Sequence, residues 1–282
     1  MSIIIDGNAI AEAIKQEIVA EIAKCRSTPR FAIYQIGEDE SSRTYAVSLE
    51  KSAQKLNIQC DYYQEDEDTE ADILAASFTA LAEDSEVHGL LLLRPLQNQT
   101  LEHILSMCIP PHKDIDCANP LSMGLLAVGK PILLPPTPAA CIEILKRSGI
   151  KTAGKLTAVV GRSNVVGKPL ALMLARKGEG DATVVICHSK TADLTEVLIR
   201  ADIVIAAAGS PRLIKAKMIK PGAVVIDAGI NWTEKGMTGD VDFAEVQQKA
   251  SMITPVPGGL GPVTKMMLFK NLLQAYHLQE KK

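Results

Sequence analysis

The chain of 282 residues contains no apolar run long enough to cross a membrane, because runs such as GLLLL at 89–93 have only the length of a strand. No basic segment followed by a long apolar one opens the sequence, so we expect no secretory signal. Its 30 basic and 33 acidic residues nearly cancel, which gives a formal net charge of -3. This balance gives no reason to expect a nucleic acid or an anionic membrane as a partner. We therefore expect a cytoplasmic protein.

Aromatic residues and histidines are also scarce. Aromatic residues make up 4% of the chain, so the core is expected to be aliphatic. The five histidines and the absence of any C-x-x-C pair argue against a metal centre. Six cysteines in a large chain without an export signal are expected to be buried, reduced thiols.

What the sequence does contain is an alternation of strand and helix signals. In the first half, helices are predicted at 9–24, 42–56 and 69–84, and strands at 31–37, 58–63 and 87–93. The segment Asp6-Gly7-Asn8 precedes the first helix as a candidate cap. Such alternation is typical of parallel βαβ units.

Residues 109–138 are rich in proline and turn residues, which favours a loop region packed around a site over a simple linker. A second alternating block follows, with a last helix predicted at 262–277. Its apolar strands each end in glycine or a polar residue, the pattern of a doubly wound sheet. We predict an α/β fold of two domains: a domain at 1–137, completed by the C-terminal helix 262–282, and a Rossmann-like domain at 138–261.

The segment VVGRSNVVGKP at 159–169 passes from a strand through a glycine turn into a helix. Helix N-terminal amides after such a turn favour an anion. The segment lacks the G-x-G-x-x-G fingerprint, so by itself an ordinary strand-to-helix turn is equally compatible with it.

The end of the following strand favours a particular dinucleotide. A carboxylate that would bind a ribose 2′-hydroxyl is missing there, and His188, Ser189 and Lys190 stand in its place. With Arg162 in the preceding loop, these groups favour a 2′-phosphate and hence NADP.

Several motifs in order, GRSNVVGKP, VVIDAGIN, GDVDF and ITPVPGGLGPVT, with KDID at 113–116 before them, closely resemble the methylenetetrahydrofolate dehydrogenase/cyclohydrolase family. The resemblance runs from Ile36 to about Asn271. It implies a two-domain, usually homodimeric enzyme in which tetrahydrofolate derivatives and NADP meet in a cleft. Such enzymes oxidise 5,10-methylenetetrahydrofolate and then hydrolyse the methenyl product to 10-formyltetrahydrofolate.

The resemblance also implies roles for individual residues. Tyr45 is expected to lie beside or stack on the folate, and Asp116 to accept hydrogen bonds from the pterin. Taken alone, Tyr45 is compatible with a half-buried helix residue and Asp116 with a turn residue. The residues expected to contact NADP are Gly161, Arg162, Ser163, Ser189 and Ile230, and those expected to line the cleft are Pro257, Gly258 and Gly259.

Four positions depart from the family pattern. Pro136 stands where the family usually has the cysteine of P-C-T-P, and Cys117 follows KDID where a glycine is common. The other two departures matter most. The family has a lysine four residues after the tyrosine, where this chain has Leu49, and a glutamine where it has Leu93. In the family the lysine is the general acid/base and the glutamine hydrogen-bonds it. Arg94 follows, and we expect it to pair with an acid or a substrate glutamate, although a surface arginine is an equal alternative.

The resemblance implies an NADP-dependent methylenetetrahydrofolate dehydrogenase, and these departures predict that its cyclohydrolase activity is lost or weak. One alternative is the full bifunctional enzyme, with Lys51, a water or a rearranged loop serving as the base. Another is a non-catalytic folate- or nucleotide-binding paralogue.

Overall fold

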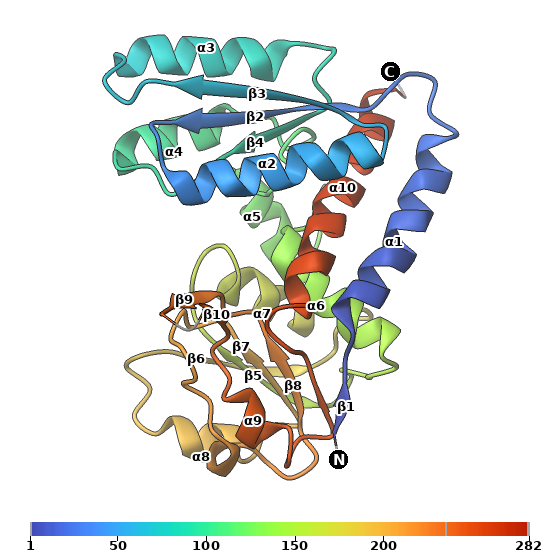
Figure 1. Cartoon of the computed structure of the whole chain (residues 1–282), viewed down its shortest axis with the longest axis vertical. Coiled ribbons are helices and arrows are strands. Elements are labelled where there is room, and N and C mark those ends of the chain that lie inside the picture. Colours follow the sequence, from blue (N-terminus) through green and yellow to red (C-terminus); the bar gives the residue numbers. More distant parts are fainter. Residues whose placement is uncertain (1, 235, 281–282) are drawn as a thin grey trace. The chain divides into compact units, whose positions relative to one another are not determined.

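The computed structural model describes residues 2–234 and 236–280 and divides into two compact units (Figure 1). Unit 1 comprises Met1–Ile14 and Thr137–Met267, and unit 2 comprises Lys15–Pro136 and Leu268–Lys282. Helices α1 (Gly7–Ile22) and α10 (Leu260–Gln279) contribute residues to both. Within the described residues, no helix has the length and apolar character needed to cross a membrane.

Unit 2 is built on a three-stranded parallel sheet of order β3-β2-β4. Its strands are β2 (Arg30–Ile36), β3 (Gln59–Glu65) and β4 (Gly89–Leu92), joined by α2 (Glu40–Lys55) and α3 (Ala71–Glu83). The chain moves outward from β2 to β3 and then back past β2 to β4. Right-handed crossovers therefore place α2 and α3 on opposite faces of the sheet (Figure 1).

Alternate residues of these strands form two cores. Tyr34 and Leu92 pack with Phe78 of α3 in the cluster that also includes α4 (Gln99–Cys108). Phe31 points to the other face, where its ring meets Phe269 of α10 edge-on with 6.0 Å between centroids. Strand alternation, continued past Leu92, directs the next side chain to the face that α2 covers.

Unit 1 contains a six-stranded parallel sheet of order β1-β11-β8-β7-β5-β6. Its buried strands are nearly all aliphatic, as expected for a sheet covered on both faces. The direction of winding reverses between β5 and β7, and ligands of open α/β sheets bind beyond the carboxyl ends at such a point. The strands are β1 (Ile3–Ile4), β5 (Leu156–Val160), β6 (Thr183–Cys187), β7 (Ile203–Ala206), β8 (Val224–Asp227) and β11 (Met252–Ile253).

Shorter elements complete the described chain. They are α5 (Pro120–Ala127), α6 (Pro136–Arg147), α7 (Gly167–Ala175), α8 (Leu194–Leu198), the 3-10 helix η1 (Ala216–Met218), α9 (Phe243–Val246) and the antiparallel hairpin β9 (Asn231–Thr233) and β10 (Gly236–Thr238).

The predicted two-domain α/β fold is confirmed, and Asp6 caps α1 by accepting hydrogen bonds from the backbone N–H groups of Asn8 and Ala9 at 2.9 and 3.1 Å. Three details differ from prediction. Residues 1–14 belong to unit 1, because β1 pairs with β11. Helix α10 begins in unit 1, and the proline-rich segment contains α5. All six cysteines are free, as expected, but the expected burial holds for three of them: Cys117, Cys141 and Cys187 are buried, whereas Cys25, Cys60 and Cys108 are only partly buried.

Close backbone packing at the start of α1 generates a stability prediction. A Cβ atom on Gly7 would lie 1.7 Å from the carbonyl oxygen of Gly259, whereas one on the helical residue Gly124 would meet nothing within 4 Å. We expect Gly7→Ala to lower the free energy of unfolding by about 1–3 kcal/mol, the usual cost of overpacking. Urea denaturation measures this free energy of unfolding. Gly124→Ala is the matched control and is expected to be neutral or stabilising by up to about 1 kcal/mol; equal effects of the two variants would contradict the prediction.

Candidate functional site

The candidate folate site in unit 2 lies at the carboxyl ends of β2 and β4. Tyr45 is on α2, the helix that follows β2, and Arg94 follows β4 directly. The segment around Asp114 runs beside β4 and pairs with Leu90 as a parallel bridge, with the Leu90 N–H donating to the carbonyl of Lys113 at 2.8 Å. These three segments come together where the winding direction of the small sheet reverses.

Asp116 and Arg94 form an ion pair at this edge. The Arg94 Nη2 donates to Asp116 Oδ2 at 2.8 Å, and the two side chains are 20% and 25% exposed. Burial raises the pKa of the Asp116 carboxyl above its usual range, and the Arg94 guanidinium opposes that shift. The prediction that Arg94 pairs with an acid is confirmed.

Tyr45 belongs to the same group of side chains. Its pKa is raised well above the ordinary value, first by desolvation of the phenol and second by the negative charge of Asp116. The residue still exposes 39% of its surface. A neutral, partly exposed phenol suits stacking better than proton abstraction.

Leu49 occupies the position one helical turn after Tyr45 and is completely buried, together with Ala46 and Ala53 on the same helix face. Leu93 is also buried, at 6% exposure, and its N–H continues the pairing with the carbonyl of Tyr34 at 2.9 Å. An alkyl side chain can neither accept nor donate a proton. Lys51 is exposed and lies on the other side of α2 from Leu49.

Asp114 is a residue whose role the sequence analysis missed. Its carboxylate is fully buried and accepts hydrogen bonds from the backbone N–H groups of Ala118 and Asn119 and from the hydroxyl of Ser122. Burial raises the pKa of Asp114 to about 6, against those hydrogen bonds. Asp114 thus holds the turn that carries Asp116. The two aspartates of the KDID motif therefore differ, because Asp114 binds its own segment and Asp116 pairs with Arg94.

In unit 1 the candidate dinucleotide site begins at Gly161, at the carboxyl end of β5. The residue has φ = 139°, and a Cβ there would lie 2.0 Å from the carbonyl oxygen of Ala207. The backbone ends of β5 and β7 therefore approach each other closely at the point where the sheet winding reverses. Only glycine allows this approach.

The loop from β5 to α7 carries polar groups that face solvent. Ser163 Oγ accepts a hydrogen bond from the Val166 N–H at 3.1 Å and helps to start α7. Arg162 is exposed, and so is Ser189, which follows the neighbouring strand β6. A guanidinium, hydroxyls and helix N-terminal amides along one edge fit the phosphate groups of a dinucleotide.

Asp240 organises the loop after β7 and was not identified from the sequence. One carboxylate oxygen accepts from the N–H groups of Ala208 and Gly209 at 2.6 and 2.9 Å. The other accepts from the Ser210 N–H and from Asn231 Nδ2, both at 2.8 Å. The motif GDVDF contains this aspartate. Its contact with the loop after β7 could not be inferred from the sequence, because it depends on how the chain folds.

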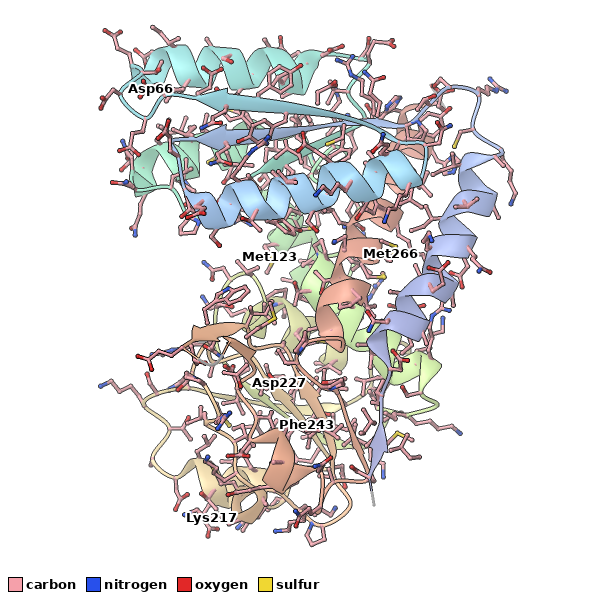
Figure 2. The ribbon with its side chains drawn as sticks, viewed as in Figure 1. Asp66, Met123, Lys217, Asp227, Phe243 and Met266 are labelled. Atoms are coloured by element: carbon pink, nitrogen blue, oxygen red, sulfur yellow. The ribbon has the colours of Figure 1, made fainter. Side chains whose placement is uncertain are left out.

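Asp227, at the end of β8, completes the support beneath this edge (Figure 2). It accepts hydrogen bonds from the N–H groups of Gly229, Asp240 and Val241. Burial raises its pKa to about 6. Just beyond it, Ile230 is 59% exposed.

The segment Pro257–Gly259 also lies in unit 1, at the start of α10. Gly258 has φ = 93°, and a Cβ on Gly259 would lie 2.3 Å from the carbonyl oxygen of Pro255. Glycine is therefore required by the backbone at this turn. Its contact with folate stays a prediction.

Family comparisons match both units. Residues 5–116 match the catalytic domain of tetrahydrofolate dehydrogenase/cyclohydrolase, and residues 135–280 match its NAD(P)-binding domain. The chain belongs to this family. This match confirms the predicted nicotinamide cofactor. The matched NAD(P)-binding domain includes the glycine turn at Gly161 and the hydrogen bonds of Asp240.

Individual members of the tetrahydrofolate dehydrogenase/cyclohydrolase family resemble the chain over nearly its whole length. The bifunctional protein FolD of Chloroflexus aggregans is 47% identical over 279 residues, which is 96% of each chain. A 5,10-methylenetetrahydrofolate dehydrogenase from the silkworm Bombyx mori is 38% identical, with a TM-score of 0.93 over 100% of each chain. The Trypanosoma brucei dehydrogenase-cyclohydrolase, solved with NADP and an inhibitor, is 32% identical, with a TM-score of 0.92 over 100% of this chain and 99% of that one.

The Asp240 network generates a prediction about the dinucleotide loop. We expect Asp240→Asn to weaken NADPH binding about tenfold or more, because an amide turns donors toward backbone N–H groups and leaves them unpaired at about 1–3 kcal/mol each. Titration calorimetry measures the affinity. Asp242→Asn is the matched control, since it removes the same charge two residues away and disrupts the ion pair with Lys215 without touching the loop after β7. Equal affinities of the two variants would contradict the assigned role.

Proposed function

We propose that the protein oxidises 5,10-methylenetetrahydrofolate to the 5,10-methenyl form with NADP, and that its cyclohydrolase activity is lost or weak. The observation that carries the second part is the buried alkyl side chain of Leu49 beside Tyr45, where a proton-transfer group would act. Family membership and the dinucleotide site of unit 1 support the first part.

Within this proposal the two half-sites have separate tasks. Tyr45 stacks on or lies beside the folate, Asp116 accepts hydrogen bonds from the pterin, and Pro257–Gly259 line the substrate's path. Arg162 and Ser189 bind the 2′-phosphate, while Gly161, Ser163 and Ile230 contact the rest of the dinucleotide. NADP, when bound, supplies the hydride acceptor.

Hydride transfer needs no titrating side chain. The methylene carbon lies between two nitrogens that stabilise the cation it becomes, so no protein proton moves in this step. Binding and alignment of the reactants supply most of the catalysis. A neutral Tyr45 and an apolar Leu49 are compatible with that requirement.

Hydrolysis of the methenyl cation makes the opposite demand. The attacking water loses a proton, and a ring nitrogen gains one as the ring opens. A positioned base contributes about 10²–10⁴-fold to such steps. Leu49 and Leu93 cannot act in this way, Tyr45 holds its proton tightly, and Asp116 is engaged by Arg94.

A full bifunctional enzyme is the second candidate. It is favoured by the name of the Chloroflexus aggregans relative, the bifunctional protein FolD, which is 47% identical to this chain. It requires a substitute base. The exposed Lys51 lies on the wrong side of α2 for that task, so a water or a rearranged loop would have to serve.

We also propose that the protein is a homodimer and that it is cytoplasmic. Light scattering would measure the oligomeric state.

The test of the function follows NADPH and the methenyl chromophore together after mixing the protein with 5,10-methylenetetrahydrofolate and NADP. We expect both to rise in step and methenyl to decay at its uncatalysed rate. Rapid consumption of methenyl identifies the bifunctional enzyme instead. Binding of both ligands without turnover identifies a non-catalytic paralogue.

Restoring the missing groups tests the cause. The double variant Leu49→Lys/Leu93→Gln is expected to accelerate methenyl hydrolysis, by up to the ~10²–10⁴-fold that a positioned base contributes. Leu49→Met/Leu93→Met is the matched control, because it changes the same buried positions without adding a base. Lys51→Ala is expected to leave hydrolysis unchanged. Equal hydrolysis by the lysine and methionine variants would reject Leu49 as the cause.

A further inference from the structure

Arg94 is the cation that acts on Asp116, and it comes from a different segment than the helix carrying Tyr45 and Leu49. Its Nη2 lies 2.8 Å from Asp116 Oδ2, and its side chain is four-fifths buried. The helix position one turn after Tyr45 holds no charge. The positive charge of this half-site is therefore fixed at the end of β4.

Stability alone does not account for the placement of Arg94. Its Nε atom is buried and has no hydrogen-bond partner among the described residues. A buried N–H without an acceptor costs about 1–3 kcal/mol, and exceptions of this kind call for an explanation. The Arg94 side chain thus leaves its Nε–H without an acceptor while its Nη2 donates to Asp116.

We propose that Arg94 is a positioning residue that keeps the Asp116 carboxylate ionised and oriented, so that Asp116 accepts the N–H donors of a pterin. This inference rests on the proposed function and goes beyond it, because it assigns to Arg94 the recognition of the substrate's ring. A guanidinium remains charged and is a poor base. It therefore supports folate binding without restoring hydrolysis.

The charge state of Asp116 decides what it can bind. An ionised carboxylate presents acceptors only, whereas a protonated one presents an O–H donor toward the pterin's N–H donors. Burial pushes Asp116 toward the protonated form and Arg94 pushes it back. The other titratable groups that face it are Tyr45 from α2 and Asp114 and Cys117 from its own segment, whose pKa values the charge of Asp116 raises.

Removal of the Arg94 charge should therefore move the pH dependence of folate binding. With the guanidinium gone, the pKa of Asp116 rises, and the acceptor form is lost at a higher pH on acidification. An adjacent opposite charge typically lowers an aspartate pKa by about 1–3 units. We expect the midpoint at which affinity falls to move upward by about one pH unit or more.

The experiment measures tetrahydrofolate binding by titration calorimetry from about pH 5 to pH 9 for wild type, Arg94→Gln and Arg94→Lys. Arg94→Gln keeps a polar side chain but removes the charge, and its midpoint should shift upward. Arg94→Lys keeps the charge, and its midpoint should stay near that of wild type. Asp116→Asn should bind at least about tenfold more weakly and report only the ligand's own pH dependence.

A double variant separates positioning from a purely structural role. Arg94→Gln/Asp116→Asn should lose no more affinity than Asp116→Asn alone, because Arg94 acts through Asp116. An equal loss of affinity at every pH in Arg94→Gln, an unshifted midpoint, or additive losses in the double variant would overturn the proposal. Circular dichroism and urea denaturation check that each variant is folded, because Arg94 and Asp116 lie in unit 2 and NADPH binding to unit 1 would not report on it.

These outcomes are independent of turnover. If the wild type binds tetrahydrofolate with the expected pH dependence but transfers no hydride, the proposed reaction fails and the role of Arg94 stands. If hydride transfer is intact and the midpoint does not move in Arg94→Gln, the role of Arg94 fails and the proposed reaction stands.

Discussion

A carboxylate removed from water must be given donors or a cation, and this constraint shapes both candidate half-sites. In unit 2, Asp114 takes backbone N–H groups and a hydroxyl, while Asp116 takes the guanidinium of Arg94. In unit 1, Asp240 gathers backbone amides from the loop after β7. Carboxylates thus hold the segment around Asp114 in unit 2 and the loop after β7 in unit 1.

The same constraint explains why the apolar pair Leu49 and Leu93 is compatible with the fold. A lone buried lysine or glutamine would need a partner, and replacing both members of such a pair by leucine leaves no unsatisfied group. Both leucines are buried here. The half-site keeps its phenol, its carboxylate and one permanent positive charge. These are groups for binding and orienting a substrate, and none of them transfers protons readily.

The sequence predicted well what depends on local chemistry. Apolar strands alternating with amphipathic helices predicted both parallel sheets, because the periods of strands and helices are properties of the chain itself. The glycine turn at Gly161 was visible for a similar reason, since only glycine permits its backbone conformation. Helix α5 was missed because prolines and turn residues surround it, although Asn119 caps it and Pro120 begins it. Strands β1 and β11 were missed because two-residue strands carry no period.

By itself, the sequence determined the α/β class, the order of the motifs and the absence of a titrating side chain at Leu49, because these follow from residue identity and spacing. Only the tertiary structure decided that Arg94 pairs with Asp116, that Asp114 is structural, and that Asp240 lies beneath the loop at Gly209. Arg94 and Asp116 are 22 residues apart, and Asp240 and Gly209 are 31 apart. Sheet topology brings such distant residues together, and their spacing along the chain does not predict these contacts.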